Sequence, residues 1–132
     1  LDLAIELIGA DPSSATAKGE GAPLNAVSAE VTFANGATAA FRSSRRADTR
    51  ARTTRIVYPS GAVEVDFIAR TMRDTTGFAF DPDFAAKVTD PLGASVEAFL
   101  KACLGEGPCI APGAAAAKAV RLANMIDAAA QA

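Results

Sequence analysis

The sequence contains no histidine and no tryptophan, and it has only two cysteines. Without histidine, neither a Ser-His-Asp nor a Cys-His catalytic arrangement can form. A structural zinc site takes four ligands, mostly Cys and His, so Cys103 and Cys109 are interpreted as free thiols. We therefore predict no metal site, and no catalytic residue of the histidine-dependent kinds.

Strong charge and long apolar runs are also lacking. The net charge of −2 argues against an electrostatic surface for nucleic acid or an anionic membrane. No apolar run approaches the roughly 20 residues of a membrane span. Asp2 and Glu6 interrupt the first apolar segment, which excludes a signal peptide there. We expect a cytoplasmic protein that binds neither nucleic acid nor a membrane.

Half of the 132 residues are hydrophobic, which is enough for one domain with its own core. The chain starts at Leu1 without a methionine, and Leu1 opens an apolar helix. We therefore expect residues 1–132 to be a single domain of a longer protein.

Antiparallel strands dominate the first two thirds of the chain. Val27, Ala29, Val31 and Phe33 alternate with polar residues, which is the period of a half-buried strand. The following Asn-Gly pair at 35–36 is a strong hairpin signal. Further turns separate a series of predicted strands at 13–18, 27–33, 37–44, 50–58, 62–68 and 70–78. Consecutive strands of this kind form a meander.

Helices are expected at both ends. Residues 1–9 read as the end of one helix, and Asp90-Pro91 as the capped start of another. This second helix carries an apolar stripe at helical spacing. A third helix is predicted at 112–129, with a buried side made of Val120, Leu122, Ala123, Met125 and Ile126. The order predicts an α+β fold: an open, mainly antiparallel β-sheet covered on one face by helices.

Few residues suggest chemistry. The segment Gly19-Glu20-Gly21 lacks the third glycine and the following helix of a dinucleotide-binding loop. Glu64 and Asp66 lie two apart on one strand and are either an acid/base pair or a polar row of a half-buried sheet. We favour the polar row, and we predict no catalytic and no cofactor-binding residue in this chain.

A group of arginines is the most unusual feature. Guanidinium groups suit phosphate or carboxylate recognition. The alternative is that they lie at solvated edges and form salt bridges with Asp48, Glu64 and Asp66. The group consists of Arg42, Arg45, Arg46, Arg50, Arg52 and Arg55.

Several segments together resemble the C-terminal domain of the Gfo/Idh/MocA oxidoreductases. Residues 1–9 resemble the helix after that family's His-x-x-Asp motif, and Val-Thr-Phe-Ala-Asn-Gly-Ala at 31–37 resembles its Asn-Gly hairpin. Residues 55–66 are similar to its Gly-centred turn and next strand. Asp90-Pro91-Leu92 and residues 97–100 resemble its closing Pro-Leu … Glu-x-Phe helix, and residues 113–129 its last helix.

The resemblance implies a parent enzyme that transfers hydride between NAD or NADP and a sugar, polyol or nucleotide-linked sugar. The family's dinucleotide fingerprint and its Glu-Lys-Pro lysine belong to an N-terminal Rossmann domain that is absent from this chain. If Asp2 matches the aspartate of His-x-x-Asp, the catalytic histidine lies upstream of Leu1. The isolated domain is then expected to be inactive and to bind no NAD(P) itself.

The resemblance also implies roles for the domain within the parent. Arg45 and Arg46 follow the second strand of the hairpin, where the family often meets substrate, and are expected to bind substrate oxygens. The sheet face away from the helices is expected to form a homodimer interface, through the row Ser28, Glu30 and Thr32 and the row Glu64, Asp66 and Ile68.

Two other hypotheses about function also fit the sequence. The chain could be a non-enzymatic α+β interaction module. It could also be a phosphate- or nucleotide-sugar-binding domain that uses its arginines.

Overall fold

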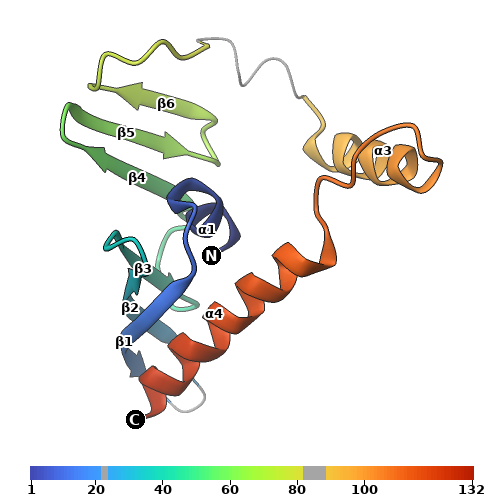
Figure 1. Cartoon of the computed structure of the whole chain (residues 1–132). Helices are drawn as coiled ribbons and strands as arrows, with labels where there is room; N and C mark the ends of the chain where they lie inside the picture. Colours follow the sequence, from blue (N-terminus) through green and yellow to red (C-terminus); the bar gives the residue numbers. More distant parts are fainter. Residues whose placement is uncertain (22–23, 82–88) are drawn as a thin grey trace. The chain divides into compact units, whose positions relative to one another are not determined.

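The computed structural model describes residues 1–21, 24–81 and 89–132 (Figure 1). Two compact units make up the chain, the first formed by residues 1–47 and 110–132 and the second by residues 48–109. Each unit contains one three-stranded antiparallel sheet, in which the strands follow chain order. The predicted α+β class and the meander connectivity are confirmed.

In the first unit, the helix α1 (Asp2–Ile8) precedes the strands β1 (Pro12–Glu20), β2 (Ala26–Phe33) and β3 (Thr38–Ser44). Gly9 ends α1 in the left-handed region, at φ +66°, and its N–H donates to the carbonyl of Ile5. Glycine adopts this conformation without the steric cost that a Cβ brings. The strand expected at 13–18 is longer than predicted.

The β2–β3 hairpin turns at the Asn-Gly pair. The N–H of Ala37 donates to Asn35 Oδ1 over 3.1 Å, and Gly36 has φ +84°. Asn35 Nδ2 also donates to the carbonyl of Ile8, at 3.1 Å. The turn residue therefore fixes the hairpin and ties it to the end of α1.

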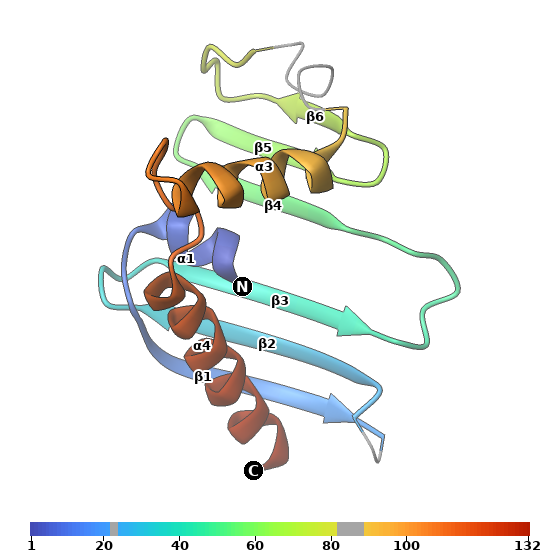
Figure 2. The same ribbon diagram turned by 90° about the vertical axis from the view of Figure 1, so that its right-hand side faces the viewer.

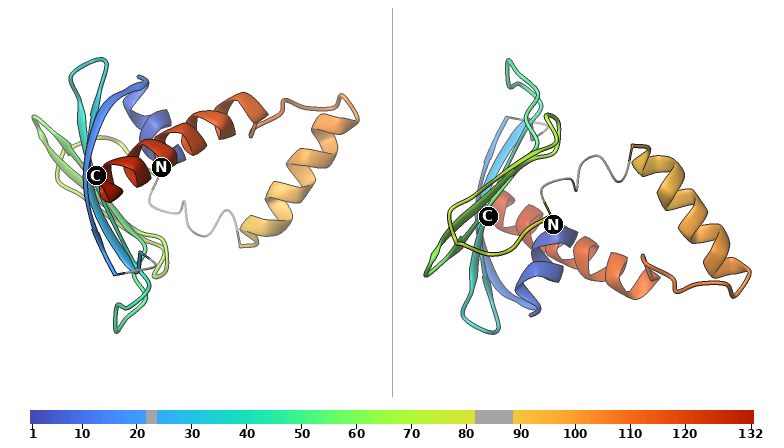
Figure 3. Two further views of the ribbon diagram at one scale, coloured as in Figure 1. Left: turned by 90° about the horizontal axis from the view of Figure 1, so that it is seen from below. Right: turned by 90° about the horizontal axis from the view of Figure 1, so that it is seen from above.

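Helix α4 (Gly113–Gln131) lies across β1 and β2 (Figure 2). It covers the same face of β1–β3 as α1 does (Figure 3). In the core between these helices and the sheet, Phe33 is 1% exposed and Leu122 is 0% exposed. Alternate β2 residues enter this core, as the sequence predicted. The core consists of Ile5, Ala29, Val31, Phe33, Leu122 and Ile126.

One predicted core residue is wrong. Val120 is 59% exposed, whereas Leu122 and Ile126 are buried. The apolar residues of α4 span more than one face, and the strands beneath the helix select the face that contains Leu122. Val120 is left on the outer side.

The second unit contains β4 (Thr53–Tyr58), β5 (Gly61–Asp66), β6 (Thr71–Asp74) and α3 (Pro91–Cys103). All three strands are shorter than predicted. Asp66 Oδ1 accepts the N–H groups of Ile68 and Ala69 at 2.8 and 2.9 Å, which turns the chain at the end of β5. Ile68 therefore lies in the turn, and the expected row of Glu64, Asp66 and Ile68 is reduced to its two carboxylates.

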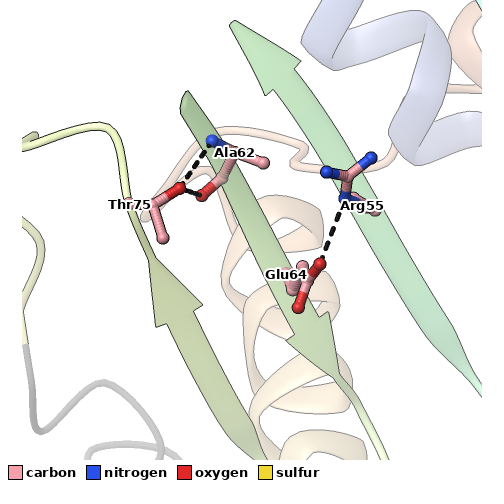
Figure 4. A network of polar contacts seen from close by, with 4 residues as sticks. All are labelled: Arg55, Ala62, Glu64 and Thr75. Atoms are coloured by element: carbon pink, nitrogen blue, oxygen red, sulfur yellow. Dashed lines mark hydrogen bonds and ion pairs between the residues drawn. The ribbon is translucent and has the colours of Figure 1, made fainter. Parts of the chain in front are cut away.

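A tight turn joins β4 to β5. Tyr58 pairs with Gly61, and Gly61 has φ +149°. Across from it, Thr75 Oγ1 accepts the N–H of Ala62 at 3.0 Å (Figure 4). A Cβ at Gly61 would collide with the backbone of Thr75. Both the backbone angle and the close approach therefore require glycine here.

Helix α3 begins where the sequence predicted. The side chain of Asp90 accepts the N–H of Gly93 at 2.9 Å, and Pro91 occupies the first turn. The capping aspartate satisfies one of the N–H groups that a helix start leaves free. No helix in the described part of the chain is long and apolar enough to cross a membrane.

Candidate functional site

Arg45 and Arg46, the predicted substrate ligands, lie immediately after β3 in the first unit. The N–H of Arg45 donates to the carbonyl of Asn25 at 2.8 Å, and that of Arg46 donates to Ser44 Oγ at 3.1 Å. Their backbone is therefore held at the end of the β2–β3 ladder. Both residues are exposed, and no ion pair of either guanidinium is found within residues 1–21, 24–81 and 89–132.

The other arginines are divided between the units. Arg42 lies on β3 opposite Ser28, whereas Arg50, Arg52 and Arg55 belong to the second unit. Each unit therefore contains three of the six arginines.

Arg52 and Arg55 of the second unit have partners. The guanidinium of Arg52 lies 5.7 Å from the centroid of the Phe67 ring, within the range of a cation–π contact. Arg55 Nε donates to Glu64 Oε1 at 3.1 Å (Figure 4). Of the salt bridges expected from the sequence, the pair with Glu64 is present. The side chains of this pair are 63% and 47% exposed, so its contribution to stability is small.

The polar face of β4–β6 brings further side chains together. Arg55, Glu64 and Arg73 lie opposite one another on the three strands, and so do Thr53, Asp66 and Thr71. They line a shallow hollow of about 480 Å³. Arg73 was not predicted as a site residue, although the pairing of β5 with β6 makes it the neighbour of Glu64. The hollow offers cationic, anionic and hydroxyl groups, a combination that suits a polyhydroxylated ligand.

The carboxylates of this face have structural partners. Glu64 is paired with Arg55, and Asp66 accepts two backbone N–H groups of the following turn. These contacts agree with the interpretation of a polar row and give no support to an acid/base pair.

A second hollow, of about 670 Å³, lies in the first unit between the end of α1, the Asn35 turn and the start of α4. Lys118 Nζ contacts Asp11 Oδ1 at 2.9 Å on its wall, and Glu6 also lines it. This contact joins residues distant in the sequence, and no local pattern predicted it. Asp11 therefore neutralises the ammonium group of Lys118.

The pKa of Asp74 and that of Glu97 are both lowered. The Thr76 hydroxyl and backbone N–H groups bond to Asp74 and lower its pKa. The Lys101 ammonium, bonded to Glu97 one helical turn away, lowers the pKa of that carboxyl. Both shifts favour the ionised form, whereas a general acid would need a raised pKa.

Cys103 and Cys109 are free and exposed. Within the described ranges, no group of three or more His, Cys, Asp or Glu side chains could hold a metal ion.

Residues 19–21 do not fit a nucleotide phosphate. Gly19 and Glu20 are the last residues of β1, and the next element after them is the strand β2. A phosphate-binding loop instead presents backbone N–H groups at the start of a helix.

No family model and no curated protein matches the chain. Among solved structures, it is similar to UDP-N-acetylglucosamine 3-dehydrogenase (GnnA) from Acidithiobacillus ferrooxidans, with 28% identity and a TM-score of 0.81. A second crystal form of that enzyme gives 27% identity and a TM-score of 0.78. Each match covers 97% of this chain and 43% of the other.

The aldose-aldose oxidoreductase from Caulobacter crescentus, complexed with glycerol, has the same fold at 20% identity and a TM-score of 0.71. That match covers 98% of this chain and 42% of the other, so the chain spans less than half the length of its structural neighbours. In its fold and in the order of its motifs, the chain is similar to the C-terminal domains of these two oxidoreductases, which are of the Gfo/Idh/MocA type.

Proposed function

We propose that the chain is the C-terminal domain of an NAD(P)-dependent oxidoreductase that acts on a sugar, polyol or nucleotide-linked sugar. The observation that carries the proposal is the match to UDP-N-acetylglucosamine 3-dehydrogenase across 97% of the chain at a TM-score of 0.81. The match favours a nucleotide-linked sugar, because that class is the substrate in the neighbour's name.

In this proposal the domain shapes the substrate pocket and the nucleotide-binding domain of the parent holds the cofactor. Nicotinamide chemistry is supplied by the cofactor, while the protein positions the substrate and moves protons. Residues 19–20 end a strand and are followed by another strand rather than a helix, so we assign them no cofactor contact. Thermal unfolding of the isolated chain is expected to be unchanged by NAD(H) or NADP(H).

Arg45 and Arg46 are the proposed substrate ligands. Their side chains are exposed and their backbone is anchored at the end of β3. A guanidinium fork can donate two parallel hydrogen bonds to a phosphate or carboxylate. A nucleotide-linked sugar provides such phosphate oxygens, whereas a free sugar provides only hydroxyl groups.

Steady-state kinetics of the parent enzyme test this role. Arg45→Ala and Arg46→Ala are each expected to lower kcat/KM for a nucleotide-linked sugar about tenfold, because a charge-assisted hydrogen bond contributes about 1.5 kcal/mol. Arg121→Ala, which changes another exposed arginine of the same unit on α4, is the matched control. Equal kcat/KM in all four proteins would remove Arg45 and Arg46 from the substrate site.

The outer face of β1–β3 is the proposed interface of a homodimer. Ser28, Glu30 and Thr32 are exposed there, and the small residue Ala40 lies opposite Glu30. Short side chains allow two sheets to approach closely. Ala40→Arg should therefore convert a dimer into a monomer in analytical ultracentrifugation, and a wild-type protein that is monomeric at high concentration would contradict the interface.

A binding domain without redox activity is the second candidate. The absence of ion pairs at Arg45 and Arg46 in the described structure favours it. Titration of the isolated chain with a nucleotide sugar at low and high salt separates the candidates, because a binding domain would show saturable, salt-sensitive affinity.

A further inference from the structure

Helix α3 has an apolar face that the other described residues of the second unit leave uncovered. Leu92, Val96, Phe99 and Leu100 are 75%, 51%, 63% and 55% exposed. They recur every three or four residues and so lie on one side of the helix together with Cys103. We call these five residues the α3 apolar face. No residue of α3 is buried.

The helix is nevertheless well formed at its ends and on its polar side. Asp90 caps its first turn, and Glu97 pairs with Lys101 at 2.6 Å one turn apart. Local contacts of this kind stabilise a helix only weakly. A helix of 13 residues is marginal in water, and proteins stabilise such helices mainly by covering the apolar face.

The residue types of the α3 apolar face indicate what kind of surface can bind it. It contains no charged residue, and its large side chains are aliphatic or aromatic. An apolar surface of another domain fits this face, whereas a charged or strongly hydrated ligand does not. In the first unit, α1 and α4 already cover the inner face of β1–β3, where Phe33 and Leu122 are almost fully buried.

We propose that the α3 apolar face is the docking surface for the nucleotide-binding domain of the parent oxidoreductase, an inference that rests on the proposed function. The match to the dehydrogenase covers 97% of this chain, so α3 lies within the shared region. That enzyme has more than half of its length outside the match. In the parent, a domain of this length could supply the apolar surface that covers the helix.

Cys103 provides a native probe of the proposal. It lies on the α3 apolar face, and Cys109 lies beyond the end of the helix; both are exposed. We would measure alkylation of each thiol by N-ethylmaleimide with peptide mass spectrometry, in the isolated chain and in the full-length parent. Both thiols should react at similar rates in the isolated chain. In the parent, Cys103 should react about tenfold or more slowly relative to Cys109, because a covered thiol reacts only when its cover opens.

Substitutions in the same two proteins give a second readout. Val96→Ser and Phe99→Ser should leave the melting temperature of the isolated chain unchanged and lower that of the parent. Glu97→Gln, on the polar side of α3, is the matched control and should alter neither protein by more than a surface substitution does.

Three results would overturn the proposal. Equal reactivity of Cys103 in both proteins would mean that no domain covers the helix. Protection of Cys103 in the isolated chain at all concentrations would mean that the chain covers its own helix, and protection that appears only at high concentration would indicate a second copy. The proposed function fails separately: a parent that protects Cys103 but shows no NAD(P)-linked activity would retain the docking surface and lose the redox assignment.

Discussion

Truncation of Leu122 tests which face of α4 packs on the sheet. Leu122 is 0% exposed and packs in the core that contains Ile5, Val31 and Phe33. Leu122→Ala removes buried methyl groups and leaves a cavity, for which buried leucines lose roughly 2–5 kcal/mol. Full burial at the centre of the core places the expected loss at about 3 kcal/mol.

Val120→Ala is the matched control in the same helix. Val120 is 59% exposed, so its truncation should change the free energy of unfolding by no more than about 0.5 kcal/mol. The sequence pattern alone placed both residues on the buried side, so the pair distinguishes the observed orientation of α4 from the predicted one.

Urea unfolding followed by far-UV circular dichroism measures both variants. With an m-value of about 2 kcal/mol/M, a loss of about 3 kcal/mol shifts the midpoint of the transition that includes α4 by about 1.5 M. Equal shifts for Leu122→Ala and Val120→Ala, or a larger shift for Val120→Ala, would refute the observed orientation of α4 on the sheet.

Three further predictions follow from local contacts. Gly61→Ala should destabilise the β4–β5 turn by about 1–3 kcal/mol in urea unfolding, because φ is positive there and the new Cβ meets the backbone of Thr75; an unchanged midpoint would contradict this. Asp90→Ala removes the cap of α3 and should cost that helix about 1 kcal/mol, seen as faster amide exchange across its first turn. Because hydrogen bonds from Thr76 lower the pKa of Asp74, the contribution of this carboxylate to stability is present above its ordinary pKa of 3.8 and is lost as pH falls through the lower folded pKa. In Thr76→Val, NMR titration should find the pKa of Asp74 closer to 3.8, and the difference in stability from wild type should close on acidification.

Local signals in the sequence were sufficient where one residue determines the geometry. The Asn-Gly pair at 35–36 predicted the hairpin, because few residues other than glycine and asparagine adopt positive φ readily. Asp90 and Pro91 predicted the start of α3, because a side-chain acceptor and a residue without an N–H both suit the first turn of a helix. Alternation in β2 predicted its buried side.

Features that depend on distant partners were not predictable. The side of α4 that is buried depends on the strands beneath the helix, so the prediction that Val120 is buried was wrong. Lys118 meets Asp11 across more than 100 residues of sequence. The end of β5 depends on the side chain of Asp66, which accepts N–H groups of the turn and removes Ile68 from the strand.

The candidate site shows the same limit. Proximity in sequence grouped six arginines, of which Arg42, Arg45 and Arg46 belong to the first unit and Arg50, Arg52 and Arg55 to the second. Arg73 is a neighbour of Glu64 because the two residues pair in the β5–β6 register, which the sequence did not predict. The roles of Arg45 and Arg46 remain predictions that the kinetics of the parent enzyme test.

Hydride transfer by the full-length parent is the most direct measurement of the central claim. The purified protein would be incubated with NAD or NADP and a panel of nucleotide-linked sugars, free sugars and polyols, and formation of the reduced nicotinamide would be followed by its absorbance. The account predicts saturable turnover of at least one member of the panel. A folded, full-length protein that turns over none of these substrates with either cofactor would contradict it.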